Sequence, residues 1–467
     1  MPCVTGGRVC LIGTLAPDFA ACPLWGSAAL DCTSRGIRLV AQSIWVAVSL
    51  IVSVGAGGSL ALAQSAGYDP QQGSGDGRYQ VPHTGFLNGK FWTDTRYRYE
   101  FVDQGNLPKD ARASTLKNKT GVESGFFHGF RAGVEGEFVI ELGPDDFNNT
   151  INGKTQFPVV ADVESAEVDQ AYLESQNIPG VALLGGRYLE NLDNERYVGS
   201  VAWRQNDQTF DGGKATITAL PGVTGLYAYI GNVNRIFSDE SPVGNIPSNT
   251  HLFHLESKPM PIGTLTGYAY LIDLFDLDPL SNASYGGFLK GKRSLRDGFD
   301  YHYRLEYARQ TNYGDAPIDY EVDYARIEQG LSWSGFTTTL IYELLGSDNG
   351  VAAFQTPLAT GHIFNGFADV FLVTPPTGLQ DFYVEARYKL SPKSGAPLSY
   401  FDGLLVLAQY HEFRSAVRDL DYGSEFDFYA YLPLRNGIYA QLKYANYQAD
   451  EFFTDVEKVI FGLGYQY

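Results

Sequence analysis

The chain has 467 residues, with 34 basic and 53 acidic side chains and a formal net charge of −19 at pH 7. A nucleic-acid-binding protein needs a basic face to neutralise phosphates, so this acidic balance argues against nucleic-acid binding. Beyond the N-terminal region, no segment approaches the roughly 18 consecutive apolar residues of a membrane-spanning helix, which excludes helical spans.

Residues 1–63 have the features of a secretory signal. Arg35 and Arg38 precede an apolar run over residues 44–54. The small-residue sequence at 61–63 then predicts cleavage before residue 64. Residues 1–34 resemble no part of such a signal, which favours a true start site further downstream.

Cleavage changes the composition of the processed chain. All four cysteines precede residue 64, so the processed chain is expected to carry no disulfide or thiol chemistry. Removal of three arginines and two aspartates leaves 31 basic and 51 acidic residues, a net charge of −20. Residues 64–90 are rich in glycine and glutamine and are predicted to form a flexible periplasmic lead-in.

Residues 91–467 are dominated by alternation of apolar and polar side chains. The segments 91–101 and 381–390 show this pattern, and so does the C-terminus, where the apolar series is Val459, Phe461, Leu463, Tyr465 and Tyr467. A period of two is typical of β-strands, and one apolar face ending in aromatics is typical of a lipid-facing barrel wall. A soluble β-protein with one solvated face is the alternative. The 31 tyrosines favour the barrel, because aromatic girdles line both membrane interfaces.

The alternating runs and the breakers between them predict eighteen strands, or sixteen if the weaker segments 180–189 and 282–291 do not form two of them. The predicted strands lie near 91–103, 111–124, 128–141, 161–174, 180–189, 206–219, 223–235, 250–258, 263–275, 282–291, 299–310, 319–332, 336–345, 379–390, 402–413, 422–433, 437–448 and 456–467.

The connections support this count. The long ones, 142–160, 190–205, 236–249 and 346–378, all follow odd-numbered strands, whereas turns such as Asn436-Gly437 follow even-numbered ones. Outer-membrane barrels separate their connections in this way, with short periplasmic turns and long extracellular loops. The predicted fold class is therefore all-β, a transmembrane antiparallel β-barrel over 91–467 in a bacterial outer membrane.

A barrel of this size encloses a channel whose selectivity depends on lumen charges. Charged side chains on the polar faces of the predicted strands are Arg96, Arg98, Arg131, Glu135, Glu137, Arg304, Glu306, Glu385, Arg387 and Lys389. They are expected to line the pore. The alternative is that opposite charges on neighbouring strands pair and only stabilise the wall.

Two long segments are candidates for narrowing the pore. Segment 186–212 carries Arg187, Arg196 and Arg204, and arginine's fork of donors suits carboxylates. The alternative is a loop that packs only against itself. Segment 346–378 is too apolar for a free loop and is expected to pack into the barrel mouth or to form a lid.

The sequence offers little support for an enzyme. The seven histidines lie on separate predicted elements without a neighbouring nucleophile, and His251 and His254 fall on opposite faces of a strand. We expect no catalytic residues, no metal and no cofactor.

Four stretches resemble the alginate export porins of Gram-negative outer membranes. These are PVVADVESAEVDQAYLE at 158–174, GRYLENLDNERYVGSVAWRQNDQTFDG at 186–212, YAYIGNVNRIF at 227–237 and TPLATGHIFNGFADVFLVTPPTGLQDFYVEARY at 356–388. The resemblance implies a monomeric 18-stranded barrel in outer-membrane lipid, with an arginine-bearing constriction that passes anionic polyuronate. The sequence leaves open whether export partners in the periplasm feed the pore. The arginines in matching segments are Arg187, Arg196, Arg204 and Arg235.

The sequence thus predicts a channel that passes anionic saccharides, polyuronates such as alginate, or related small acids by charge and size filtering. The acidic surplus supports an alternative, a general or cation-preferring diffusion porin.

Overall fold

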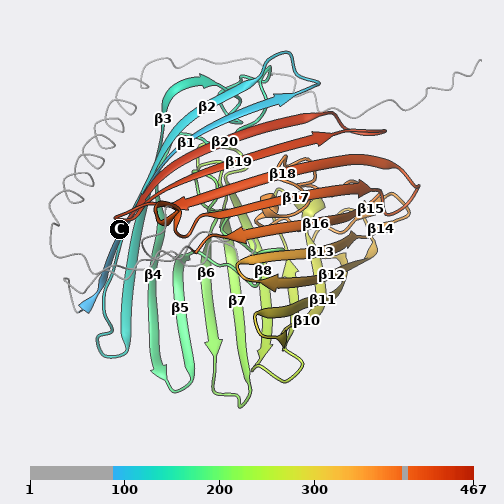
Figure 1. The fold of residues 1–467 in the computed structure, drawn as a ribbon. Coiled ribbons are helices and arrows are strands. Elements are labelled where there is room, and N and C mark those ends of the chain that lie inside the picture. Colours follow the sequence, from blue (N-terminus) through green and yellow to red (C-terminus); the bar gives the residue numbers. More distant parts are fainter. Residues whose placement is uncertain (1–87, 392–397) are drawn as a thin grey trace, which may run out of the picture. The chain divides into compact units, whose positions relative to one another are not determined.

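Eighteen strands form one antiparallel sheet in the computed structural model, which describes residues 88–391 and 398–467 (Figure 1). The strands are β1 (Lys90–Gln104), β2 (Ala111–Glu123), β3 (Phe130–Asp146), β4 (Ser165–Ile178), β5 (Val181–Tyr188), β6 (Thr209–Ile217), β7 (Val223–Asn234), β8 (Asn245–Ser257), β9 (Thr264–Ile272), β10 (Asn282–Arg296), β11 (Phe299–Asn312), β12 (Glu321–Trp333), β13 (Phe336–Leu345), β16 (Leu379–Lys389), β17 (Leu405–Arg414), β18 (Asp421–Pro433), β19 (Ile438–Gln448) and β20 (Val456–Gln466). The small hairpin of β14 (Ser347–Asp348) and β15 (Ala352–Ala353) and the short 3₁₀ turns η2 (Asp278–Leu280), η3 (Gly361–Ile363) and η4 (Ser399–Phe401) lie in connections.

The sheet closes on itself. β1 pairs with β2 on one side and with β20 on the other, from Asp94 opposite Gln466 to Gln104 opposite Val456. Because each strand has two neighbours, no edge is left to pair with another chain. Over the residues that the structure describes, no helix is long and apolar enough to cross a membrane.

The predicted eighteen-strand barrel is confirmed, including the two weaker segments, which form β5 and β10. The largest differences are at strand ends. β8 begins at Asn245 rather than near 250 because Pro247 sits opposite Asn232 at an irregularity in β7, where a missing N–H is tolerated. The predicted signal over 1–63 and most of the lead-in over 64–90 lie outside the described residues.

The outward face of the barrel is apolar. Leu173, Leu255, Leu305, Leu340 and Leu442 are each at least 40% exposed on it. Exposed aromatics lie toward both ends of the wall: Trp333, Phe336 and Tyr388 near the short turns, and Tyr229, Tyr285 and Tyr307 in the half nearer the long loops. An apolar band flanked by aromatic residues is the surface that a lipid bilayer accepts.

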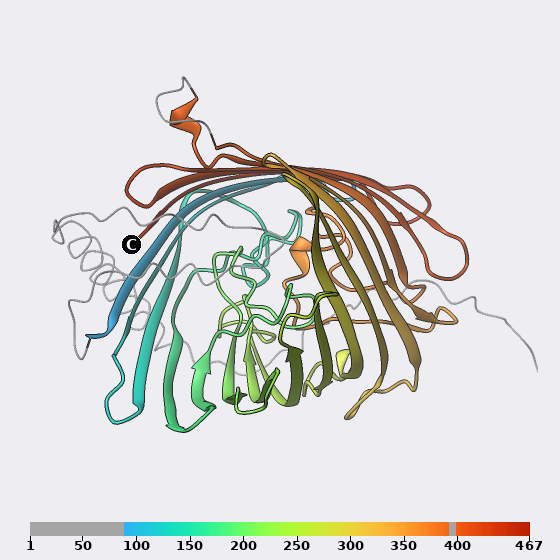
Figure 2. The same ribbon diagram turned by 60° about the horizontal axis from the view of Figure 1, so that its bottom comes forward.

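The inward face is charged, and long connections fold back to cover it. The β5–β6 loop (residues 189–208) and the β13–β16 loop (residues 346–378) lie inside the ring of strands (Figure 2). Trp203 and Phe367 on these loops are 7% and 2% exposed, so both are buried against the wall. The prediction that 346–378 packs into the barrel is confirmed.

Candidate functional site

The two inward loops are joined to each other. Val198 and Leu358 form a parallel bridge, and the Gly199 N–H donates to the Leu358 carbonyl at 2.9 Å. The Thr360 N–H donates to the Glu195 carbonyl at 3.1 Å, and the Thr360 hydroxyl bonds to the Glu195 carboxylate. Because these bonds link residues about 160 positions apart in sequence, the loops form a single unit inside the barrel.

Acidic residues of the wall hold this unit from one side. The N–H groups of Phe367 and Ala368 donate to Asp427 and Glu425 on β18, at 3.1 and 2.6 Å. The Asn365 amide donates to Glu343 on β13 at 2.7 Å. These carboxylates are buried, so each satisfies a backbone or amide donor that would otherwise lose its hydrogen bonds to water.

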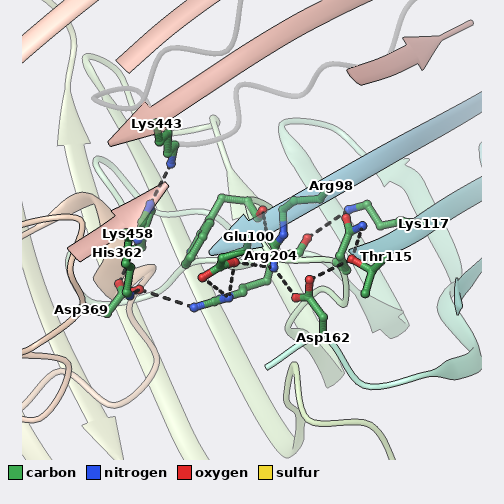
Figure 3. Close-up of polar contacts among 12 residues, drawn as sticks. Arg98, Glu100, Thr115, Lys117, Asp162, Arg204, His362, Asp369, Lys443 and Lys458 are labelled. Atoms are coloured by element: carbon green, nitrogen blue, oxygen red, sulfur yellow. Dashed lines mark hydrogen bonds and ion pairs between the residues drawn. The ribbon is translucent and has the colours of Figure 1, made fainter. Parts of the chain in front are cut away.

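Basic residues hold it from the other side (Figure 3). Arg204 lies 3.1 Å from Glu100 on β1 and 3.4 Å from Asp369, and Lys458 on β20 lies 2.6 Å from Asp369. Burial alone would lower the pKa of Arg204, but the Glu100 and Asp369 carboxylates raise it. Arg98 pairs with Asp162 and donates to the Trp203 carbonyl at 2.9 Å.

Trp203 and His362 stack where the two loops meet β19. Their ring centroids are 3.4 Å apart, with an interplanar angle of 14°. His362 donates from Nδ1 to Asp369 at 2.8 Å, and its Nε2 accepts from Lys443 Nζ at 2.7 Å. This arrangement requires neutral imidazole, and burial together with the Lys443 charge holds the pKa of His362 well below its ordinary value.

A group of three buried carboxylates has the spacing of a metal site but holds a lysine. Glu137, Asp169 and Asp207 bring oxygens within 4.8 Å of one another. The Lys119 ammonium lies 2.7 Å from Asp169 and 2.6 Å from Asp207, and Lys117 lies 3.2 Å from Asp207. We assign the group to the ion-pair network between β2 and the β5–β6 loop, because the ammonium already supplies the cation.

Of the predicted loop arginines, Arg196 and Arg204 are buried in ion pairs that hold the inward loops in place. Arg196 is 4% exposed and lies 3.0 Å from Glu343 and 4.7 Å above the Phe364 ring.

Arg235 differs from Arg196 and Arg204 in its surroundings. It stacks on Phe237 at 4.7 Å, has no carboxylate within 4 Å among the described residues, and has a pKa lowered by burial.

The prediction that Arg187 lines the pore is corrected. Arg187 alternates with Tyr188 and shares its side of β5 with Leu183, which is 41% exposed on the outward face. It pairs there with Asp211 on β6, at 2.7 and 2.8 Å. Its strand position therefore places it on the outer surface of the wall.

The strand-borne candidates lie on the lumen side, and several are paired. Ion pairs join Arg131 to Glu123 and Glu174, Arg304 to Glu306, and Arg387 to Glu385. Lys389 is exposed at the end of β16. Arg96 donates to neutral acceptors, among them Gln205 Oε1 at 3.0 Å, and no carboxylate of the described chain lies within 4 Å of it.

Sequence reasoning missed Lys117, Lys119, Lys443 and Lys458. All four occupy inward positions of predicted strands, so the alternation already contained the signal. His362 gave no comparable signal, because only the docked loop brings it to Lys443.

No model of a protein family matches the sequence, and no curated protein matches it. Solved structures resemble the fold. The chain superposes on OccAB4 of Acinetobacter baumannii with a TM-score of 0.65 at 14% identity, covering 81% of this chain and 98% of that one. OpdK of Pseudomonas aeruginosa, solved with vanillate, gives 0.63 at 15%, covering 82% and 100%. OccK5 (OpdH) of P. aeruginosa gives 0.61 at 13%, covering 82% and 99%. At such identities the likeness establishes a shared barrel fold.

Proposed function

We propose that the protein is an outer-membrane diffusion channel for small organic anions, including acidic sugars. One observation carries the proposal: a closed barrel with an apolar exterior has a densely charged lumen that two docked loops narrow. Such a lumen filters solutes by charge and width and needs no chemical step.

The outer-membrane placement rests on the surface and the connections. Exposed leucines and aromatics cover the outward face, and the outward Arg187–Asp211 pair lies near a long loop. The first and last strands begin and end at the side of the short turns. That side faces the periplasm in barrels of this class.

The anion preference rests on unneutralised cations. Arg235 has no carboxylate within 4 Å among the described residues, and Lys389 is exposed at the turn end. Arginine's planar donors suit a carboxylate. The carboxylates paired with other lumen arginines keep binding weak enough for release. A similar fold was solved with vanillate, itself an aromatic carboxylate.

A cation-preferring porin is the second candidate. The wall from β13 to β18 carries a run of buried acidic residues on its lumen side: Glu343, Asp381, Glu385, Glu425 and Asp427. Transport of a polyuronate, which the resemblance to alginate export porins implies, is the most specific form of the first candidate.

The test is the reversal potential of the processed protein, residues 64–467, in planar bilayers under a salt gradient. Anion preference with current block by glucuronate supports the proposal, and additional block by oligouronates extends it to polymers. Cation preference without block by either probe favours the second candidate. No conductance at all rejects both.

A further inference from the structure

The outward face of the wall carries a row of aromatic residues beside the short turns. Phe299, Trp333, Phe336 and Tyr388 lie on β11, β12, β13 and β16, and each is the cross-strand partner of the next. The rings of Phe299 and Trp333 stack, with centroids 5.4 Å apart and an interplanar angle of 13°. Aromatic girdles of membrane barrels lie at the level of the lipid headgroups, so this row marks that level on the wall.

An arginine continues the row onto β10. Arg296 is the cross-strand partner of Phe299, and its guanidinium carbon lies 4.3 Å from the centre of the Phe299 ring. Strict alternation from Lys292 would turn Arg296 toward the lumen, but the extra residue of a bulge after Ser294 shifts it to the outward side. The bulge therefore places a cation at the level of the headgroups.

A second arginine lies on the same side of β10. Arg293 is the cross-strand partner of Tyr301, which is two residues from Phe299 on β11. The two arginine positions are thus about 7 Å apart along the strand direction, close enough for two long side chains to approach one phosphate. Leu295, between them in sequence, is 61% exposed and adds apolar surface.

The two arginines differ from the lysines of the same strand. On the lumen side of β10, Lys290 lies 3.4 Å from Glu256 and Lys292 lies 2.8 Å from Asp300. Arg293 and Arg296 are exposed, and among the described residues no carboxylate lies within 4 Å of either. The strand therefore neutralises its inward cations and leaves its outward pair unbalanced.

Outward arginines near the long loops are neutralised as well. Arg187 pairs with Asp211 at 2.7 Å, and Arg309 on β11 lies 3.3 Å from Asp323 on β12. The unbalanced charge at the turn end of β10 is thus not a general property of the outer wall. It is complementary to an anion supplied from outside the chain.

We propose that Arg293 and Arg296 bind the phosphate of an anionic phospholipid in the periplasmic leaflet, whose acyl chains lie against Leu295 and Trp333. The inference goes beyond the passage of solutes, and it rests on the proposed outer-membrane placement. Guanidinium groups suit phosphate oxygens, and each basic residue at a membrane surface favours anionic lipid by about fivefold.

The test uses Trp333 as a reporter of the lipid beside it. Trp333 is 54% exposed, whereas Trp92 and Trp203, the other tryptophans of the described residues, are each 7% exposed. The full chain, expressed and processed in the cell, is reconstituted into phosphatidylcholine vesicles that contain increasing fractions of dibrominated phosphatidylglycerol or dibrominated phosphatidylcholine. Brominated acyl chains quench tryptophan fluorescence on contact. We expect phosphatidylglycerol to bind beside Trp333 about 5- to 25-fold more tightly than phosphatidylcholine.

Variants locate the site. The double variant Arg293→Gln, Arg296→Gln should bind both lipids equally. The matched control is Lys290→Gln, Lys292→Gln, which removes two cations from the lumen side of the same strand and should keep the preference.

The outcomes separate the lipid site from the membrane placement. No quenching by either lipid overturns both together. Equal affinity for the two lipids in the wild type, or an unchanged preference in the arginine variant, overturns the lipid site alone. Equal affinity in the wild type would leave the arginines to an acidic protein segment in the periplasm.

Discussion

At the scale of single residues, the lumen charges act mainly as docking contacts. Arg196 and Arg204 were expected to meet the substrate, yet both are buried against carboxylates of the wall or the partner loop. Removing one member of a buried pair costs roughly 3–5 kcal/mol because it strands the other charge. Arg96 is also buried and donates to the docked loop, whereas Arg235 has no carboxylate within 4 Å among the described residues.

A pH dependence follows from His362. Its pKa is held well below the ordinary value by burial and Lys443, so the docked loop excludes the imidazolium. Below pH about 6.5, His362 binds a proton when the loop is undocked but not when it is docked. The free energy that favours docking therefore falls by up to about 1.4 kcal/mol per pH unit. We expect trypsin cleavage at Arg204 to increase as the pH is lowered from 7.5 to 5.5.

The control is His362→Gln, whose amide keeps one donor and one acceptor but does not titrate. Burial alone would raise the pKa of Asp369, but Lys458 and His362 lower it. The stabilisation by Asp369 is therefore retained above pH about 4, outside the tested window. An equal pH response in wild type and His362→Gln would assign the effect to other groups.

At the scale of elements, the two inward loops form one unit because backbone groups of one loop hydrogen-bond to backbone groups of the other. Gly199 marks the tightest approach. A Cβ there would lie 2.3 Å from Thr360 Oγ1 and 2.7 Å from Glu195 Oε2. Any larger residue must therefore displace the Thr360 and Glu195 side chains, which hydrogen-bond to each other across the two loops.

Gly199→Ala should undock the loops while the barrel stays closed. We expect higher, noisier single-channel current and new trypsin cleavage at Arg196 and Arg204, which are only 4% and 6% exposed in the docked unit. The matched control is Gly267→Ala on β9, where the nearest atom to a new Cβ is Gly286 O at 4.0 Å. Identical behaviour of the two variants would contradict a coupled loop unit.

At the scale of the whole molecule, the barrel is stabilised by its closed hydrogen-bonded sheet, and the proposed outer-membrane placement adds lipid around its apolar wall. Each of the eighteen strands of the barrel pairs with two neighbours, and the wall's exposed side chains are mainly apolar in its middle. Stability against unfolding is therefore expected to depend on depth in the bilayer rather than on the lumen charges.

Leu442 and Ile438 on β19 test this dependence on depth. Both are 40% exposed on the outward face, but Ile438 begins the strand at the turn and Leu442 lies near its middle. Leu442→Arg should lower the free energy of unfolding by about 2–4 kcal/mol, and Ile438→Arg by about 0–1 kcal/mol. Urea unfolding of the protein in lipid vesicles measures both, and equal losses would argue against a membrane-spanning wall.

The sequence by itself determined the barrel. Alternation with a period of two reports which side chains face out, and turn residues such as Asn436-Gly437 report where strands end, so both signals are local. The eighteen strands and the inward face of Arg98 and Glu135 follow from them. The first residues of β8 were not predicted to be strand, because Pro247 is tolerated there only where β7 is irregular.

Only the tertiary structure decided what the lumen residues do. The contact of His362 with Lys443 and the bridging of Arg204 between Glu100 and Asp369 join segments 81 to 165 positions apart. No local pattern encodes such pairs, because they depend on how loops fold back inside the closed wall. Arg187 shows the same limit: one position along β5 decides between lumen and lipid, and only the strand register settles it.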